Sequence, residues 1–102
     1  MSRRKKETSI PPEVKSAVLE RDEHACIFCL KNTGLPNAHF ISRAQFGLGI
    51  EENILTLCPE CHYEYDYGNN REFMHECFKE YLQSKYKDWD KEKLVYRKER
   101  KC

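Results

Sequence analysis

Four of the six cysteines stand in two Cys-x-x-Cys pairs, Cys26 with Cys29 and Cys58 with Cys61. At this spacing both sulfurs of a pair can reach one ion, and Zn²⁺ in closed structural sites takes four such thiolates in a tetrahedron. The interval between the pairs exceeds the roughly 15–20 residues of a common zinc ribbon. That excess leaves room for two strands. The sequence therefore predicts a structural zinc ion on these four cysteines.

A redox-active pair and two disulfides are the alternative interpretations of these cysteines. Redox Cys-x-x-Cys motifs usually occur singly, beside a βαβ pattern that this sequence lacks. Disulfides belong to oxidising compartments. The basic start of the chain is not followed by an apolar segment typical of a secretory signal or a membrane span. We therefore expect a cytoplasmic protein that binds metal and does not enter membranes.

A second possible metal site begins directly after the last paired cysteine. His62 and Asp66 are four residues apart, so on a helix their side chains would share one face. An imidazole and a carboxylate can hold a harder divalent ion such as Mg²⁺ or Mn²⁺, with coordination positions left open. From spacing alone, however, such histidines are more often structural or surface residues than catalytic ones.

Three other residues, all earlier in the chain than His62, could complete a hydrolytic site. His39 could act as a general base, because the pKa of imidazole lies close to neutrality. Asn53 could hold a loop in place by hydrogen-bonding its backbone. Arg43 could contact a substrate phosphate, although a solvated arginine at a strand end is an equal alternative.

The elements that must position these residues follow from apolar periodicity and turn chemistry. Residues 11–22 begin with two prolines suited to a helix start. Met74, Phe78 and Leu82 fall on one face of a later amphipathic helix. The expected order is a helix at 11–22, a turn at 31–37, strands at 38–42 and 53–57, a short helix at 59–67, and a longer helix at 71–86. Trp89, Leu94 and Val95 are available to dock on this core.

The chain of 102 residues is long enough for one small domain. We expect an α+β fold with a flexible basic arm at 1–9 and a single domain at 10–102. Its motif core would span 24–68 and a helical extension 69–102. The net charge is only +1, but basic residues gather at both ends, where they could contact phosphates or simply be solvated. His24 and His75 match no pattern and are expected at the surface.

Taken together, these residues resemble a known family. The order Cys26-x-x-Cys29, "AHFISR", two loop glycines, Asn53, Cys58-x-x-Cys61 and His62 is similar to the zinc-containing, ββα-metal form of the HNH endonucleases. The resemblance covers roughly residues 15–68. It implies a ββα-metal core with flanking N- and C-terminal helices, and metal-dependent hydrolysis of DNA phosphodiester bonds. The family's general base falls on His39, its loop-holding asparagine on Asn53, and its last metal-binding histidine on His62.

One position departs from the family pattern. Many members carry a second His or Asp, also a metal ligand, directly before the general base, whereas this chain has Ala38. Asp66 could serve as the second ligand instead, or metal binding could be weak, or the active site could have degenerated. We prefer His39 as base, with His62 and Asp66 as ligands of the catalytic ion.

The sequence thus favours a DNA endonuclease with a structural Zn²⁺ and a catalytic divalent ion. One alternative is a zinc-containing module that binds nucleic acid without catalysis, which Ala38 and the basic ends would suit. Another is a zinc-stabilised protein-interaction domain, suited by the acidic stretch at 51–80. A homodimer or a protein partner could help so small a domain to hold DNA, and the sequence decides neither.

Overall fold

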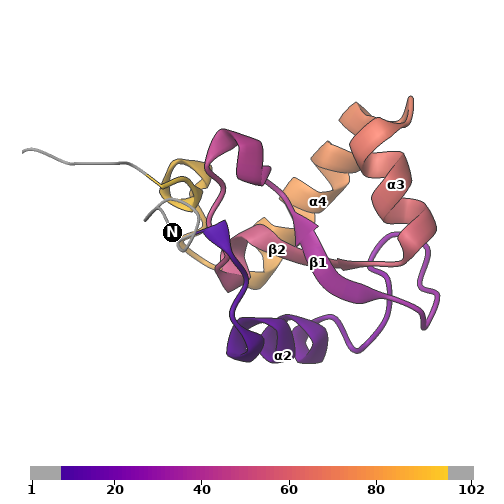
Figure 1. Ribbon diagram of the computed structural model, residues 1–102, viewed down its shortest axis with the longest axis horizontal. Coiled ribbons are helices and arrows are strands. Elements are labelled where there is room, and N and C mark those ends of the chain that lie inside the picture. The colour runs from indigo at the N-terminus through magenta and orange to yellow at the C-terminus, as the bar shows by residue number, and fades with distance from the viewer. Residues whose placement is uncertain (1–7, 97–102) are drawn as a thin grey trace, which may run out of the picture.

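The structure, a computed structural model, describes residues 8–96, so most of the predicted basic arm and the extreme C-terminus lie outside it. Within these residues the class is α+β, as expected, with one two-stranded antiparallel sheet and three α-helices. The elements are α2 (Pro12–Arg21), β1 (Leu35–His39), β2 (Ile54–Leu57), α3 (Pro59–Tyr67) and α4 (Arg71–Lys85), with the short 3₁₀ helices η1 (Arg43–Gln45), η2 (Glu51–Asn53) and η3 (Lys91–Leu94). In Figure 1, α2 lies below the sheet, and α3 and α4 lie above it. None of the helices in this part of the chain is long and apolar enough to cross a bilayer.

The first strand lies earlier in the chain than the sequence predicts. β1 runs from Leu35 to His39 rather than over 38–42, and pairs Leu35 with Leu57 and His39 with Ile54. The predicted turn at 31–37 therefore extends too far, because β1 already begins at Leu35. Pro36 stands where the register shifts, a position that tolerates a residue without an N–H. Turn chemistry and apolar content were misleading here, because cross-strand pairing decided the register.

The core lies against the face of the sheet that α3 and α4 cover. The predicted apolar face of α4 is confirmed, since Met74, Phe78 and Leu82 are buried. Phe40 and Tyr65 join them, with ring contacts between Tyr65 and Phe78. Burying these large side chains stabilises the fold by roughly 1.5–3 kcal/mol each, although small domains gain little in total.

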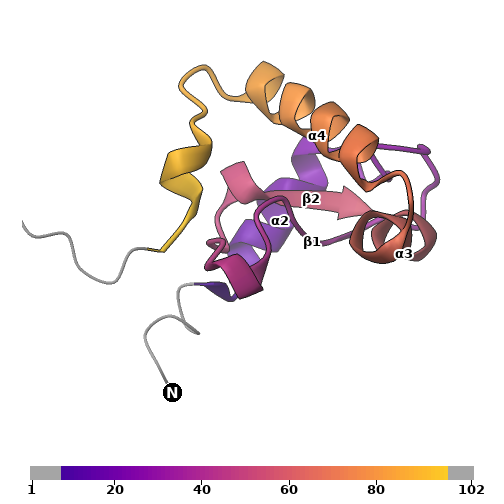
Figure 2. The same cartoon turned by 90° about the horizontal axis from the view of Figure 1, so that it is seen from above.

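The C-terminal segment is fixed to the loop between the strands, as Figure 2 shows. Leu48 donates its N–H to the carbonyl of Leu94 at 2.7 Å, and Tyr96 donates to Phe46 at 2.7 Å. Leu94 is buried and Trp89 packs on the core, so the predicted docking of this segment is confirmed. The loop that carries Arg43 is therefore held from outside the motif core.

A hydrogen-bonded pair at the end of α2 joins this helix to β2. The guanidinium of Arg21 donates to the carboxylate of Asp22 and to the carbonyl of Ile54, the latter at 2.8 Å. Asp22 also accepts the backbone N–H of Thr56 at 3.1 Å and the hydroxyl of Tyr81. The carbonyl of Thr56 in turn accepts the N–H of Ile27. Backbone groups of β2 that face away from β1 are thereby hydrogen-bonded.

The domain packs from an earlier residue than the predicted boundary at residue 10. Thr8 is 2% exposed, and its carbonyl oxygen lies 2.9 Å from Nε2 of His39. The carbonyl oxygen of Ser9 lies so close to Gly49 that a Cβ there would be 1.9 Å away. Thr8 and Ser9, which the sequence assigned to the flexible arm, therefore belong to the packed domain.

Candidate functional site

The four paired cysteines converge as predicted. One ligand atom from each of Cys26, Cys29, Cys58 and Cys61 lies within 4.8 Å of all the others, and Sγ of Cys29 is 3.6 Å from Sγ of Cys58. Sulfurs placed ~2.3 Å from one ion at tetrahedral angles would be about 3.8 Å apart. All described cysteines are free thiols. Four soft ligands in this arrangement could hold a structural metal ion such as zinc.

The local backbone prepares these sulfurs to bind a cation. The N–H of Cys29 donates to Sγ of Cys26, and the N–H of Cys61 donates to Sγ of Cys58, each at 3.4 Å. Burial raises the pKa of Cys26, but hydrogen bonds from backbone N–H groups, that of Cys29 first, outweigh it and lower the pKa to about 7. Burial raises the pKa of Cys58 and of Cys61. Four thiolates so close would repel one another, and a divalent cation removes that cost.

His39 lies at the end of β1 with its ring half-buried. Its Nε2 faces the carbonyl oxygen of Thr8 at 2.9 Å. Because a carbonyl can only accept, Nε2 must carry the proton, which leaves Nδ1 of the neutral ring as a proton acceptor. Burial lowers the pKa of His39, the Thr8 carbonyl opposes this, and the positive charges of Arg43 and His62 lower the pKa further. The lowered pKa favours the neutral ring, which is the form that a general base needs.

His62 and Asp66 share one face of α3, as the sequence predicts. Nε2 of His62 is 3.4 Å from Oδ2 of Asp66, and the two side chains are 34% and 46% exposed. Cys58 caps α3, and Cys61 lies in its first turn. The two cysteines therefore fix the position of His62, which directly follows Cys61. Both side chains are partly exposed to solvent, so an ion could reach them.

Ala38, which stands directly before His39, is part of the apolar core. It pairs with Leu55 in the sheet, is fully buried, and belongs to the apolar core. Adjacent residues of a strand point to opposite faces, and the core fills the face that Ala38 occupies. An Asp or His at this position would be buried among apolar side chains. That burial would cost free energy unless the side chain bound an ion.

Asn53 holds the loop between the strands, as predicted. Its Oδ1 accepts the N–H of Ile41 at 2.7 Å, and its Nδ2 donates to the carbonyls of Ile41 at 3.1 Å and Leu48 at 2.8 Å. Asn53 is fully buried and lies in η2 rather than in the strand. A Cβ on Gly47 would be 1.7 Å from the carbonyl oxygen of Ile41, so only glycine leaves room for this arrangement.

Arg43 is exposed and reaches toward the N-terminal segment. It donates to the hydroxyls of Thr8 and Ser9, each at 3.4 Å. Arg43, His39 and Lys15 also line one hollow of about 340 Å³. Sequence reasoning missed Lys15 because it lies in a helix with no motif. The only feature of the sequence that set Lys15 apart was its place on the exposed face of the predicted helix.

His75 was expected at the surface, but the structure shows its ring partly buried and packed on the core. Its ring stacks on Phe40 with centroids 4.1 Å apart and an interplanar angle of 11°, and its Nδ1 lies 2.7 Å from the hydroxyl of Tyr65. That hydroxyl also donates to the carbonyl of Phe40 at 3.2 Å. His75 therefore supports the residue that follows His39. Its burial lowers its pKa, and the charge of Arg71 lowers the pKa further.

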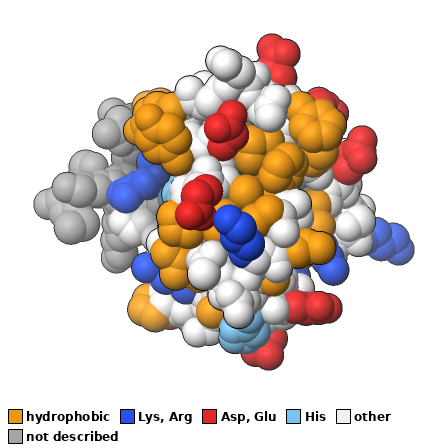
Figure 3. Space-filling view, turned by 90° about the vertical axis from the view of Figure 1, so that its right-hand side faces the viewer, with side chains coloured by type: hydrophobic (Ala, Val, Ile, Leu, Met, Phe, Trp, Pro, Cys, Tyr) orange, Lys and Arg blue, Asp and Glu red, His pale blue; other side chains and the backbone are white. Residues whose placement is uncertain are grey.

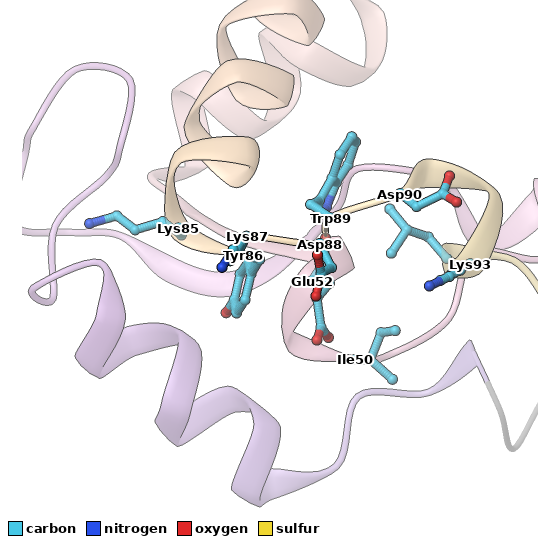
Figure 4. Close-up of a pocket in the computed structure, with 10 residues that line it drawn as sticks. Ile50, Glu52, Lys85, Tyr86, Lys87, Asp88, Trp89, Asp90 and Lys93 are labelled. Atoms are coloured by element: carbon cyan, nitrogen blue, oxygen red, sulfur yellow. Dashed lines mark hydrogen bonds between the residues drawn. The ribbon is translucent and has the colours of Figure 1, made fainter.

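A larger hollow of about 450 Å³ lies near the C-terminal end of α4 (Figure 4). Its lining includes lysines, carboxylates and Trp89, whose Nε1 donates to the carbonyl of Glu52 at 2.8 Å. None of the predicted site residues lines it. Its mixed charges select no class of ligand.

The contact between Thr8 and His39 can be tested without an activity assay. In Gly49→Ala the new Cβ would clash with the Ser9 carbonyl oxygen, so the N-terminal segment must move and the Thr8–His39 hydrogen bond should be lost. We expect the His39 ring to change from the Nε2–H form to a mixture of tautomers, measured by its ¹⁵N chemical shifts. The exposed His24 is the internal control. Unchanged His39 shifts would show that Thr8 does not set the tautomer.

No protein-family model and no curated protein sequence matches this chain. The function must therefore be argued from the residues and their geometry.

Proposed function

We propose that the protein is a metal-dependent DNA endonuclease of the HNH type, with His39 as general base. The observation that carries this proposal is the hydrogen bond from Nε2 of His39 to the Thr8 carbonyl at 2.9 Å. It leaves Nδ1 as the ring atom that can take a proton. His62 contributes to lowering the pKa of His39, and this supports placing the base and the candidate metal ligand in one site.

In this mechanism Nδ1 of His39 takes a proton from water as the water oxygen forms a bond to phosphorus. The bond from phosphorus to the leaving oxygen breaks, and the strand is cut. A divalent ion bound by His62 and Asp66 would stabilise negative charge on the phosphate and the leaving oxygen. Asn53 keeps the loop after β1 in place, which matters because small misplacements of a catalytic group cost much of its effect.

Two protein ligands suit an ion that arrives with its substrate. Mg²⁺ usually keeps several waters and binds through one or two carboxylates together with substrate phosphates. His62 and Asp66 are both partly exposed and leave such positions open. The buried methyl of Ala38 adds no ligand. We therefore propose that Asp66 is the second ligand, and that the ion is weakly held without DNA.

Nicking of supercoiled plasmid by the zinc-loaded protein tests this function, with Mg²⁺, Mn²⁺ or Ni²⁺ added. His39→Ala should lower the rate about 10²- to 10⁴-fold, because proton transfer by a positioned side chain contributes this much. His24→Ala, which changes an exposed histidine outside the site, is the matched control. Equal rates for His39→Ala and the unaltered protein would remove His39 as the base. Asp66→Ala should raise the ion concentration needed for half-maximal cleavage.

A zinc-containing module that binds DNA without cutting it is the second candidate. It is favoured by the burial of Ala38 in the core, which leaves fewer ligands for a catalytic ion. Binding of DNA without cleavage in any of the three ions, by a folded and zinc-loaded protein, would select this function.

A further inference from the structure

A hollow of about 340 Å³ beside His39 combines residues from separate parts of the chain. Lys15 comes from α2, Asn37 and His39 from β1, and Arg43 from η1. The remaining lining residues, Ser9 and Ile10, precede α2. Only the fold brings these residues together, because the sequence shows no motif that joins α2 to the loop after β1.

The chemistry of this hollow favours an anion. Lys15 and Arg43 are cations, the Asn37 amide can donate, and none of the residues that line the hollow is an aspartate or glutamate. Lys15 and Arg43 are both exposed, so a ligand can reach them. A guanidinium and an ammonium are the side chains that bind phosphate oxygens most strongly.

The guanidinium of Arg43 is held beside this hollow. Its nitrogens contact the hydroxyls of Thr8 and Ser9 at 3.4 Å, and Thr8 is buried. These contacts reduce the side-chain entropy that Arg43 would lose on binding a ligand.

The opposite end of the molecule is unsuited to a polyanion. Figure 3 shows apolar side chains interspersed with carboxylates and some Lys and Arg side chains on that face. The exposed apolar residues Tyr63, Tyr67 and Phe73 belong to α3 and α4. The exposed acidic residues of these helices are Glu60, Asp66, Glu72, Glu76 and Glu80. Away from the candidate metal site at His62 and Asp66, where a bound ion would attract a phosphate, a DNA backbone is therefore attracted to the side of Lys15 and Arg43 rather than to this face.

We propose that this hollow binds a backbone phosphate of DNA and that Lys15 is one of its binding residues. The choice of DNA as the polymer rests on the proposed function, whereas the anion site rests on the hollow itself. The bound phosphate would place the strand against His39, which lines the same hollow.

Salt dependence of DNA binding by the zinc-loaded protein tests this inference, measured by fluorescence anisotropy with a short labelled duplex and no added Mg²⁺, Mn²⁺ or Ni²⁺. Each lost phosphate contact should reduce the slope of log K against log salt by about 0.9. We expect this reduction for Lys15→Ala, and twice that reduction for Lys15→Ala combined with Arg43→Ala. Lys87→Ala is the matched control, because Lys87 is exposed and lines the other hollow. Zinc content and circular dichroism verify that each variant is folded.

The outcomes separate this inference from the proposed function, because binding is measured without catalysis. If Lys15→Ala reduces the slope and no ion supports cleavage, the phosphate site stands and the nuclease proposal fails. If the protein cleaves DNA but Lys15→Ala and Lys87→Ala have equal slopes, the nuclease stands and the phosphate site fails. Absence of measurable binding by the unaltered protein at low salt would also overturn the inference.

Discussion

Cys29→Ser should release the zinc ion and unfold the domain, even though Cys29 is exposed. A structural zinc ion contributes on the order of 10 kcal/mol at pH 7, whereas a whole domain is stable by only about 5–15 kcal/mol. The exposed cysteine is the sharpest choice because its replacement leaves no cavity in the core. Thermal unfolding followed by circular dichroism, together with zinc content by mass spectrometry, measures the effect.

Cys77→Ser is the matched control for this experiment. Cys77 lies on α4 outside the four-cysteine cluster, with its side chain partly buried, so this variant should keep its zinc. Excess EDTA added to the unaltered protein should reproduce the unfolding of Cys29→Ser. A folded, zinc-free Cys29→Ser protein would mean that the metal does not hold this fold together.

Asp22→Ala should lower the free energy of unfolding by about 3–5 kcal/mol, the usual cost of removing one partner of a buried ion pair. The carboxylate of Asp22 is fully buried, and the side chain of Arg21 is 11% exposed. Without Asp22 the guanidinium remains in a poorly solvated place, and the N–H of Thr56 and the hydroxyl of Tyr81 lose an acceptor. Urea denaturation at neutral pH measures the difference.

Two further variants show whether the loss comes from this network. Asp88→Ala removes an exposed carboxylate near α4 and should change stability by less than about 0.5 kcal/mol. Tyr81→Phe removes one hydroxyl from the network, and a double-mutant cycle with Asp22→Ala should show that the two losses are not additive. Additive losses, or equal effects of Asp22→Ala and Asp88→Ala, would contradict a coupled network.

The features that the sequence predicts well are those set by local spacing. Cys-x-x-Cys brings two sulfurs together over one turn, so both pairs were recognisable in the printed sequence. His62 and Asp66 share a face because a helix repeats every 3.6 residues. The buried face of α4 follows from the same periodicity, which Met74 and Phe78 display.

The features that the sequence does not predict depend on contacts between distant segments. The start of β1 at Leu35 is set by pairing with Leu57, whereas the local residues indicate a turn. The Thr8 carbonyl is a backbone group, so no residue type at position 8 signals its contact with His39. Lys15 and His75 gain their places from the packing of α2 and α4, and neither belongs to a motif.

The hydrogen bonds on the outer side of β2 also bear on how the protein behaves at high concentration. Arg21, Asp22 and Ile27 occupy the carbonyl of Ile54 and both backbone groups of Thr56. An unpaired strand edge would be a template for adding a strand from another molecule. These three residues therefore cap the β2 edge of the sheet against intermolecular β-pairing, and damage to the Asp22 network would expose an aggregation-prone edge as well as weaken the fold.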